Sequence, residues 1–209
     1  AYNPNTSFGP QLKAIADGTK PLSDLFALMS TPGFTLGRTN PNTDPQGQAF
    51  YEMVELAQST LHLPTGIAKK LLGPLNNPSQ VFAETALESR LQAGQLDAAS
   101  AFLSQAIQLH LPYITLPSTI NFGNPSMAST YAAASLTLTS GEVVHGVPLV
   151  VDVTTLGHTD SAAAGAFVAY LLSPPARASF KKSGYELLTP TVFGNKSAVP
   201  TEVQHALGG

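Results

Sequence analysis

The segment GRTNPNTDPQGQAF, residues 37–50, links a predicted strand to a predicted helix through a turn-rich loop. The preceding FTLGRT (34–39) has the composition of a strand. Thr43 or Asp44 can cap the following helix, with Pro45 at its first position and Gln46 spaced from Thr43 as in a capping box. The helix itself is indicated by apolar residues at three- and four-residue steps, namely Phe50, Met53, Val54, Ala57 and Leu61.

The composition is that of a folded globular protein without a strong charge bias. The chain has 209 residues, a formal net charge of −3 and only 10 Lys and Arg residues. A nucleic-acid binder needs a basic surface to displace phosphate counterions, so that class is disfavoured. No apolar run approaches the length of a membrane span. There is no cysteine, so disulfides, thiolate nucleophiles and cysteine metal sites are excluded.

Predicted strands and helices alternate along the chain. This order favours an α/β fold, with a mostly parallel sheet. The last predicted strand is apolar and β-branched enough to be buried on both faces. Helices are expected within 9–30, from 50 and over 80–93, 160–172 and 173–184, and strands over 34–39, 96–103, 113–116, 135–140 and 147–154.

The sequence offers no strong catalytic motif. SFKK (179–182) matches the S-x-x-K of penicillin-recognising enzymes, but the companion S-D-N and K-T-G motifs are missing, which favours a solvated helix face. Asp44 has two interpretations. It either caps the helix and interacts with its dipole, or it lies in the anion-binding corner that a strand, a turn and a helix N-terminus form in open α/β sheets.

Five segments in order resemble one family, the tungstate and molybdate binding proteins of ABC transporters, particularly the tungstate-binding type. Any one of them is a weak match, but together they span nearly the whole chain. They are FTLGRTNPNTDPQG (34–47), ETALESRLQAGQLDAASAFLSQA (84–106), LPYITLPSTINFGNP (111–125), VHGVPLVVDVTTL (144–156) and AAGAFVAYLLSPPARASFKKSGYELLTP (163–190).

The resemblance implies a two-lobed periplasmic binding protein of type II, which binds a dianionic oxyanion between α/β lobes. It implies that two carboxylates, here Asp44 and Glu84, coordinate the tungsten or molybdenum centre. An aromatic position beside the ligand falls on Phe102, and backbone groups at Asn42 are expected to face the oxyanion. For Glu84 the alternative interpretation is an acidic residue that complements a helix dipole, and for Phe102 it is a core residue.

A pair of carboxylates beside a dianion needs a physical reason. Each unit-charge pair at about 4 Å costs on the order of 4 kcal/mol at an effective dielectric near 20. The arrangement is favourable only if the carboxylate oxygens bond to the metal atom itself, or if the ligand is a cation.

The chain departs from the family pattern in places. Gln-Gly-Gln-Ala (46–49) replaces the usual Cys-Gly-Tyr-Arg, and Ala98 and Phe102 replace two usual tyrosines. The chain starts near a segment that resembles the hinge strand entering the second lobe, so most of the first lobe has no counterpart. We expect residues 1–146 to form lobe two and residues 147–209 the C-terminal part of lobe one, with self-association if the chain is a true fragment.

The expected function is therefore that of an extracytoplasmic or periplasmic solute-binding protein, free or membrane-anchored, that delivers tungstate or molybdate to an ABC transporter permease. No cofactor and no nucleic-acid partner are expected. The alternative is a ligand-sensing regulatory domain of the same fold. An enzyme that uses Asp44 and Glu84 as an acid and base pair is a third, less favoured interpretation.

Overall fold

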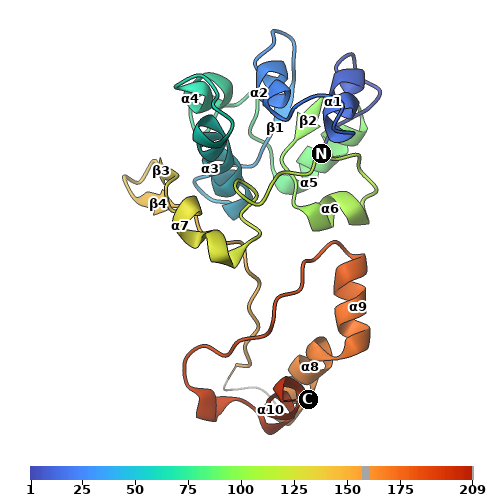
Figure 1. Cartoon of the computed structure of the whole chain (residues 1–209), viewed down its shortest axis with the longest axis vertical. Coiled ribbons are helices and arrows are strands. Elements are labelled where there is room, and N and C mark those ends of the chain that lie inside the picture. The colour runs from blue at the N-terminus through green and yellow to red at the C-terminus, as the bar shows by residue number, and fades with distance from the viewer. Residues whose placement is uncertain (157–160, 209) are drawn as a thin grey trace. The chain divides into compact units, whose positions relative to one another are not determined.

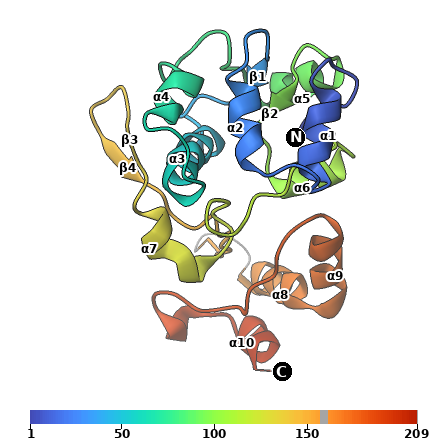
Figure 2. The ribbon, with the colours of Figure 1, turned by 45° about the horizontal axis from the view of Figure 1, so that its top comes forward.

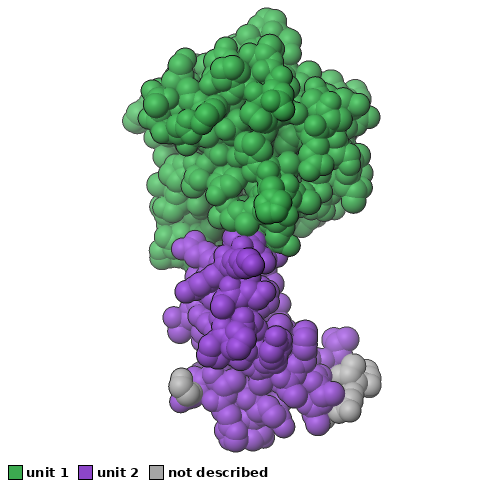
Figure 3. All heavy atoms as spheres, turned by 90° about the vertical axis from the view of Figure 1, so that its right-hand side faces the viewer, with its two compact units in different colours: residues 1–149 green, residues 150–209 purple. Residues whose placement is uncertain are grey.

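The computed structural model describes residues 1–156 and 161–208. The chain divides into two compact units, Ala1–Leu149 and Val150–Gly209, which are coloured separately in Figure 3. Each unit is described by itself below.

The first unit is built mainly of helices, with short strands between them (Figure 1). Its elements are α1 (Gly9–Ala16), α2 (Ser23–Met29), β1 (Leu36–Gly37), α3 (Pro45–Thr60), α4 (Ile67–Leu72), α5 (Glu84–Gln92), β2 (Ala98–Ala99), α6 (Leu103–Gln108), η1 (Pro125–Met127), α7 (Ala128–Tyr131), β3 (Ser135–Thr137) and β4 (Val143–His145).

The centre of this unit is a short parallel sheet. β1 and β2 are parallel, with Leu36 opposite Ala98 and Gly37 opposite Ala99. An isolated parallel bridge joins Arg38 to Val81, and an antiparallel bridge joins Tyr2 to Ala98. The other sheet is the antiparallel β3–β4 hairpin, which lies beside α3 in Figures 1 and 2. The prediction of a mostly parallel sheet is therefore not confirmed.

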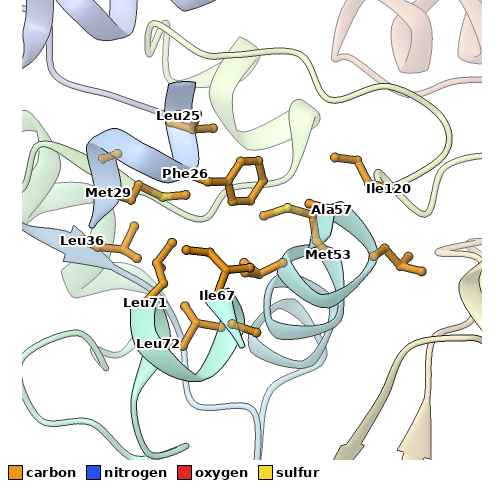
Figure 4. Close-up of a cluster of buried hydrophobic side chains, with 14 of the residues drawn as sticks. Leu25, Phe26, Met29, Leu36, Met53, Ala57, Ile67, Leu71, Leu72 and Ile120 are labelled. Carbon is orange, nitrogen blue, oxygen red and sulfur yellow. The ribbon is translucent and has the colours of Figure 1, made fainter. Parts of the chain in front are cut away.

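Apolar side chains cover both faces of the β1–β2 pair. Successive strand residues point to opposite faces. Leu36 and Ala98 accordingly belong to the main core and Ala99 to a second cluster. The main core unites α2, α3 and α4 (Figure 4), and includes Leu25, Phe26, Met29, Met53, Ala57, Ile67, Leu71, Leu72 and Ile120. The second cluster consists of Leu87, Leu91, Leu96, Ala99, Ala106 and Leu111.

Arg38 is fully buried at the end of β1. Its guanidinium donates hydrogen bonds to the carbonyl oxygens of Leu72 (3.2 Å), Pro74 (3.0 Å) and Leu75 (3.0 Å), and to Oε1 of Gln80 (3.2 Å). Burial lowers the pKa of the guanidinium. The side chain therefore fixes the connection that follows α4 against the end of the strand.

Several sequence predictions are confirmed and others need correction. The helix led by Pro45 has Asp44 as its N-cap, and α5 ends just before Gly94, whose φ is +73°. The helix predicted from residue 80 begins at Glu84, because Val81 pairs with Arg38 instead.

The predicted strand 96–103 shrinks to Ala98–Ala99, and α6 begins at Leu103. Neither 113–116 nor 147–154 forms a strand. The latter has strand-forming residues, but a strand also requires a hydrogen-bonded neighbour, and no described residue pairs with it in a sheet. Val147, Val151 and Val153 are instead exposed.

The second unit contains α8 (Ser161–Leu172), α9 (Pro174–Lys182), η2 (Lys196–Ala198) and α10 (Thr201–Leu207). α8 contacts both α9 and α10. Few apolar side chains are buried among the described residues of the second unit, namely Val168, Ala176 and Val203. Phe167 and Phe193 are 60% and 78% exposed. Ser179 and Lys182 are exposed on α9, which confirms the solvated face predicted for SFKK.

Glu52 is a buried carboxylate on the core face of α3. It is 4% exposed, and its Oε1 has no hydrogen-bond partner among the described residues. Burial, reinforced by the negative charge of Glu55, raises the pKa of Glu52 from 4.5 to about 7. The folded protein therefore retains a proton on Glu52 over a pH range in which the unfolded chain has released it.

This difference predicts that the protein loses stability as the pH rises. The contribution of Glu52 is fully present below pH 4.5, and it is lost as the pH rises through about 7. Glu52→Gln should raise the free energy of unfolding at pH 8 by about 2 kcal/mol and change it little at pH 4. Urea denaturation at both pH values measures this. Glu142→Gln, on an exposed turn, is the control, and an equal effect of both variants would contradict the assignment to Glu52.

Candidate functional site

Three loops meet at the carboxyl ends of the parallel segments. Residues 39–44 follow β1, residues 82–83 follow the Val81 bridge, and residues 100–102 follow β2. Each loop leads directly into the N-terminus of a helix, α3, α5 or α6. In open α/β sheets ligands bind outside the carboxyl ends of the strands, and free N–H groups at helix N-termini favour anions. We therefore take this edge as the candidate site.

Asp44 is the N-cap of α3. Its Oδ1 accepts a hydrogen bond of 2.8 Å from the backbone N–H of Gln46. The capping interpretation is thus confirmed. The predicted capping box between Thr43 and Gln46 is wrong, because Asp44 is the N-cap and the side chain of Gln46 donates to Gln105. The carboxylate is half-buried, and no described hydrogen bond engages its Oδ2.

Glu84 is the first residue of α5, where an acid complements the helix dipole. Its side chain is exposed. Its Oε1 accepts a hydrogen bond from Nε2 of Gln105. Its Oε2 is engaged by no hydrogen bond among the described residues.

Two glutamines connect Asp44 and Glu84, and sequence reasoning missed both. Nε2 of Gln46 donates to Oε1 of Gln105 at 2.7 Å, across 59 positions of the chain. Gln105 in turn donates to Glu84. The only local signal was the position of Gln105 three residues after the N-cap of α6, where its Oε1 accepts from the N–H of Phe102 at 2.8 Å.

Asn42 and Phe102 lie on the same edge. Oδ1 of Asn42 accepts from the N–H (2.9 Å) and the hydroxyl (3.0 Å) of Thr139, tying the loop to the β3–β4 turn. The N–H of Asn42 donates to Oδ1 of Asn40, so it reaches an oxyanion only if this bond opens. Phe102 is the half-buried N-cap of α6.

Neither carboxylate is neutralised by a cation in the described part of the chain. The ion pairs there are Lys13–Asp17 and Lys20–Asp24, both on the surface. Arg38 precedes the 39–44 loop, but its donors are occupied by carbonyl and amide oxygens. Within residues 1–156 and 161–208, no group of three or more His, Asp or Glu side chains is arranged to hold a metal ion.

A polar cavity of about 620 Å³ lies at the opposite, amino-terminal end of the strands. Thr35 and Asp97 line it, and these residues precede β1 and β2. Oδ2 of Asp97 already accepts from the N–H and the hydroxyl of Thr35, each at 2.7 Å. The cavity is thus separate from the edge that carries Asp44 and Glu84.

Gly47 allows the 39–44 loop to lie against the first turn of α3. A Cβ at this position would lie 2.6 Å from the carbonyl oxygen of Thr39 and 2.8 Å from the nitrogen of Pro41. Both contacts are with backbone atoms, which cannot rotate away.

We expect Gly47→Ala to lower the free energy of unfolding by about 1–3 kcal/mol, because the loop must shift. Urea denaturation measures the change. Gln48→Ala, the next position in the same helical turn, should change it by less than about 0.5 kcal/mol. If both substitutions had equally small effects, the close approach of loop and helix would not be a constraint.

A model of the family described as "Bacterial extracellular solute-binding protein" matches residues 2–186. The chain belongs to this family. The description is of a binding protein rather than an enzyme, and it indicates an extracytoplasmic location. The family implies an α/β fold, and the parallel pair β1–β2, in which each strand is followed by a helix, agrees with it. None of the described helices is both long enough and apolar enough to span a bilayer.

Two named relatives are similar to this chain over most of its length. A protein of Haloferax volcanii named "Putative ABC transporter molybdenum-binding protein" is 35% identical over 164 residues, which are 78% of this chain and 49% of the relative. The "Molybdate/tungstate-binding protein WtpA" of Pyrococcus abyssi is 28% identical over 200 residues, covering 86% and 57%. The chain spans about half the length of these curated relatives.

Proposed function

We propose that this family member is the solute-binding component of an ABC transporter and binds tungstate or molybdate. Asp44 and Glu84 would coordinate the metal centre of the oxyanion. One observation carries the proposal. Two carboxylates without cationic partners among the described residues lie at one carboxyl edge of the sheet, and Gln46 and Gln105 link them, through the backbone N–H of Gln46 at Asp44 and through both glutamine side chains towards Glu84.

The charge arrangement supports direct coordination over simple hydrogen bonding. Carboxylates cannot donate hydrogen bonds, and they repel the oxygens of a dianion. Their lone pairs are useful to an electrophilic tungsten or molybdenum atom, whose coordination would expand from four towards six oxygens. Partial positive charge from the N-termini of α3 and α5 would offset part of the repulsion. Asn42 and Phe102 would flank the ligand.

The proposed domain assignment follows the family resemblance. Residues 1–146 would form lobe two of the receptor, and residues 147–209 the C-terminal part of lobe one. The exposed apolar residues of 147–156 and of α8 agree with surfaces that another segment or another copy covers. Ligand binding would close the two lobes, and the closed receptor would deliver the oxyanion to a permease in a periplasmic or other extracytoplasmic setting.

The test is a calorimetric titration of the protein with tungstate, molybdate and sulfate. Tungstate and molybdate should bind and sulfate should not compete, because sulfur does not add carboxylate ligands. X-ray absorption at the tungsten edge should then show six oxygen neighbours. Equal binding of sulfate, or four neighbours in the bound state, would contradict carboxylate coordination.

A further inference from the structure

We propose that Gln105 is a positioning residue of the oxyanion site, which holds Glu84 ready for coordination and couples it to Asp44 through Gln46. This inference rests on the proposed function. Gln46 is a feature of this chain, because the family that the sequence resembles usually has a cysteine at this position.

The direction of the hydrogen bonds at Gln105 is fixed by a backbone group. The N–H of Phe102 can only donate, so the atom of Gln105 that faces it at 2.8 Å is the oxygen Oε1. Nε2 therefore faces Glu84, whose carboxylate can only accept. Oε1 also accepts from Nε2 of Gln46 at 2.7 Å, which orients the second amide as well.

The resulting path runs from one carboxylate to the other. Asp44 accepts from the N–H of Gln46, the side chain of Gln46 donates to Gln105, and Gln105 donates to Glu84. Gln46 is 4% exposed, so water competes little for its amide. Each carboxylate is held through one oxygen, and no described hydrogen bond occupies the other. Such outer contacts limit rotation of a ligand side chain and aim its second oxygen.

Amides suit this task better than charged groups. An Arg or Lys at position 46 or 105 would neutralise the carboxylates and attract the oxyanion's own oxygens. A glutamine orients Glu84 without removing its charge. Gln105 also accepts two hydrogen bonds while it donates one, so it joins the loop after β2 to the first residue of α5.

Gln105→Glu isolates the donated hydrogen bond. A glutamate retains both acceptor contacts, with Phe102 and Gln46, but it cannot donate to Glu84 and repels it. We expect tungstate affinity to fall by about 10- to 100-fold, as when an outer partner of a metal ligand is lost. Thermal unfolding should change little. Gln108→Glu, one turn further along α6 on an exposed side chain, adds the same charge and should leave affinity within about twofold of the unmodified protein.

A double variant, Glu84→Gln with Gln105→Glu, exchanges the two side chains and completes the experiment. It restores an amide–carboxylate pair and the original net charge, so it separates the position of the carboxylate from the extra charge that Gln105→Glu adds. We expect a normal unfolding temperature but weak tungstate binding, because the carboxylate stands at the wrong position. Restored affinity in the exchanged protein would overturn the positioning role.

Single variants separate this inference from the proposed function. If Glu84→Gln lost tungstate binding while Gln105→Glu bound normally, the positioning role would be wrong and coordination by Glu84 would stand. If both variants bound tungstate as the unmodified protein does, coordination by Glu84 would be wrong, and the role of Gln105 with it.

Discussion

Glu84→Gln and Asp44→Asn should each weaken tungstate binding by more than about 100-fold. Loss of an outer hydrogen-bond partner already costs about 10- to 100-fold in metal affinity, and loss of a direct ligand should cost more. Both substitutions keep the size of the side chain. In Asp44→Asn the side-chain carbonyl oxygen can still accept from the N–H of Gln46, so the cap of α3 is retained.

Titration calorimetry with tungstate, together with thermal unfolding of each variant, measures the effect. Glu88→Gln is the matched control, because Glu88 lies one turn after Glu84 on α5 and undergoes the same charge change. We expect it to bind tungstate within about threefold of the unmodified protein. A loss as large in Glu88→Gln would indicate a general charge effect in place of coordination.

Arg38→Met should lower the free energy of unfolding by about 3–5 kcal/mol, because it removes several hydrogen bonds from a charged donor, each worth roughly 1.5–3 kcal/mol before the cost of burying the guanidinium is subtracted. Methionine fills part of the volume but donates no hydrogen bond. The carbonyl groups of Leu72, Pro74 and Leu75 would lose the donor that they share. The carbonyl groups of Leu72 and Pro74 would keep hydrogen bonds from Asn77, so most of the loss comes from the charged donor itself.

Urea denaturation gives the comparison, with Arg90→Met as control. Arg90 is exposed, where it donates to Gln95 and stacks on Phe82 at 4.6 Å. Its loss should cost about 1 kcal/mol or less. Similar costs at both positions would show that the 72–80 connection does not depend on the buried guanidinium.

The site was accessible to sequence reasoning only in part. Asp44 as an N-cap follows from its position before Pro45, and Glu84 as an early acid of a helix follows from local rules. The proposal that they share a ligand came from the family resemblance. Arg38 gave no local signal at all, because its burial depends on carbonyl groups that lie 34 to 37 positions further along the chain.

Local sequence features were sufficient for the helix that follows Asp44, for the family and for the candidate carboxylates. The helix depends on neighbouring residues, through apolar spacing and capping, whereas the family and the candidate carboxylates follow from the order of five motifs along the chain. Other features depend on contacts between distant parts of the chain. Gln46 and Gln105 meet only because β1 and β2 are paired, whereas residues 147–154, despite their strand-forming composition, form no strand among the described residues. A strand or an amide bridge needs a hydrogen-bonding partner from a distant part of the chain, and local sequence preferences do not specify that partner.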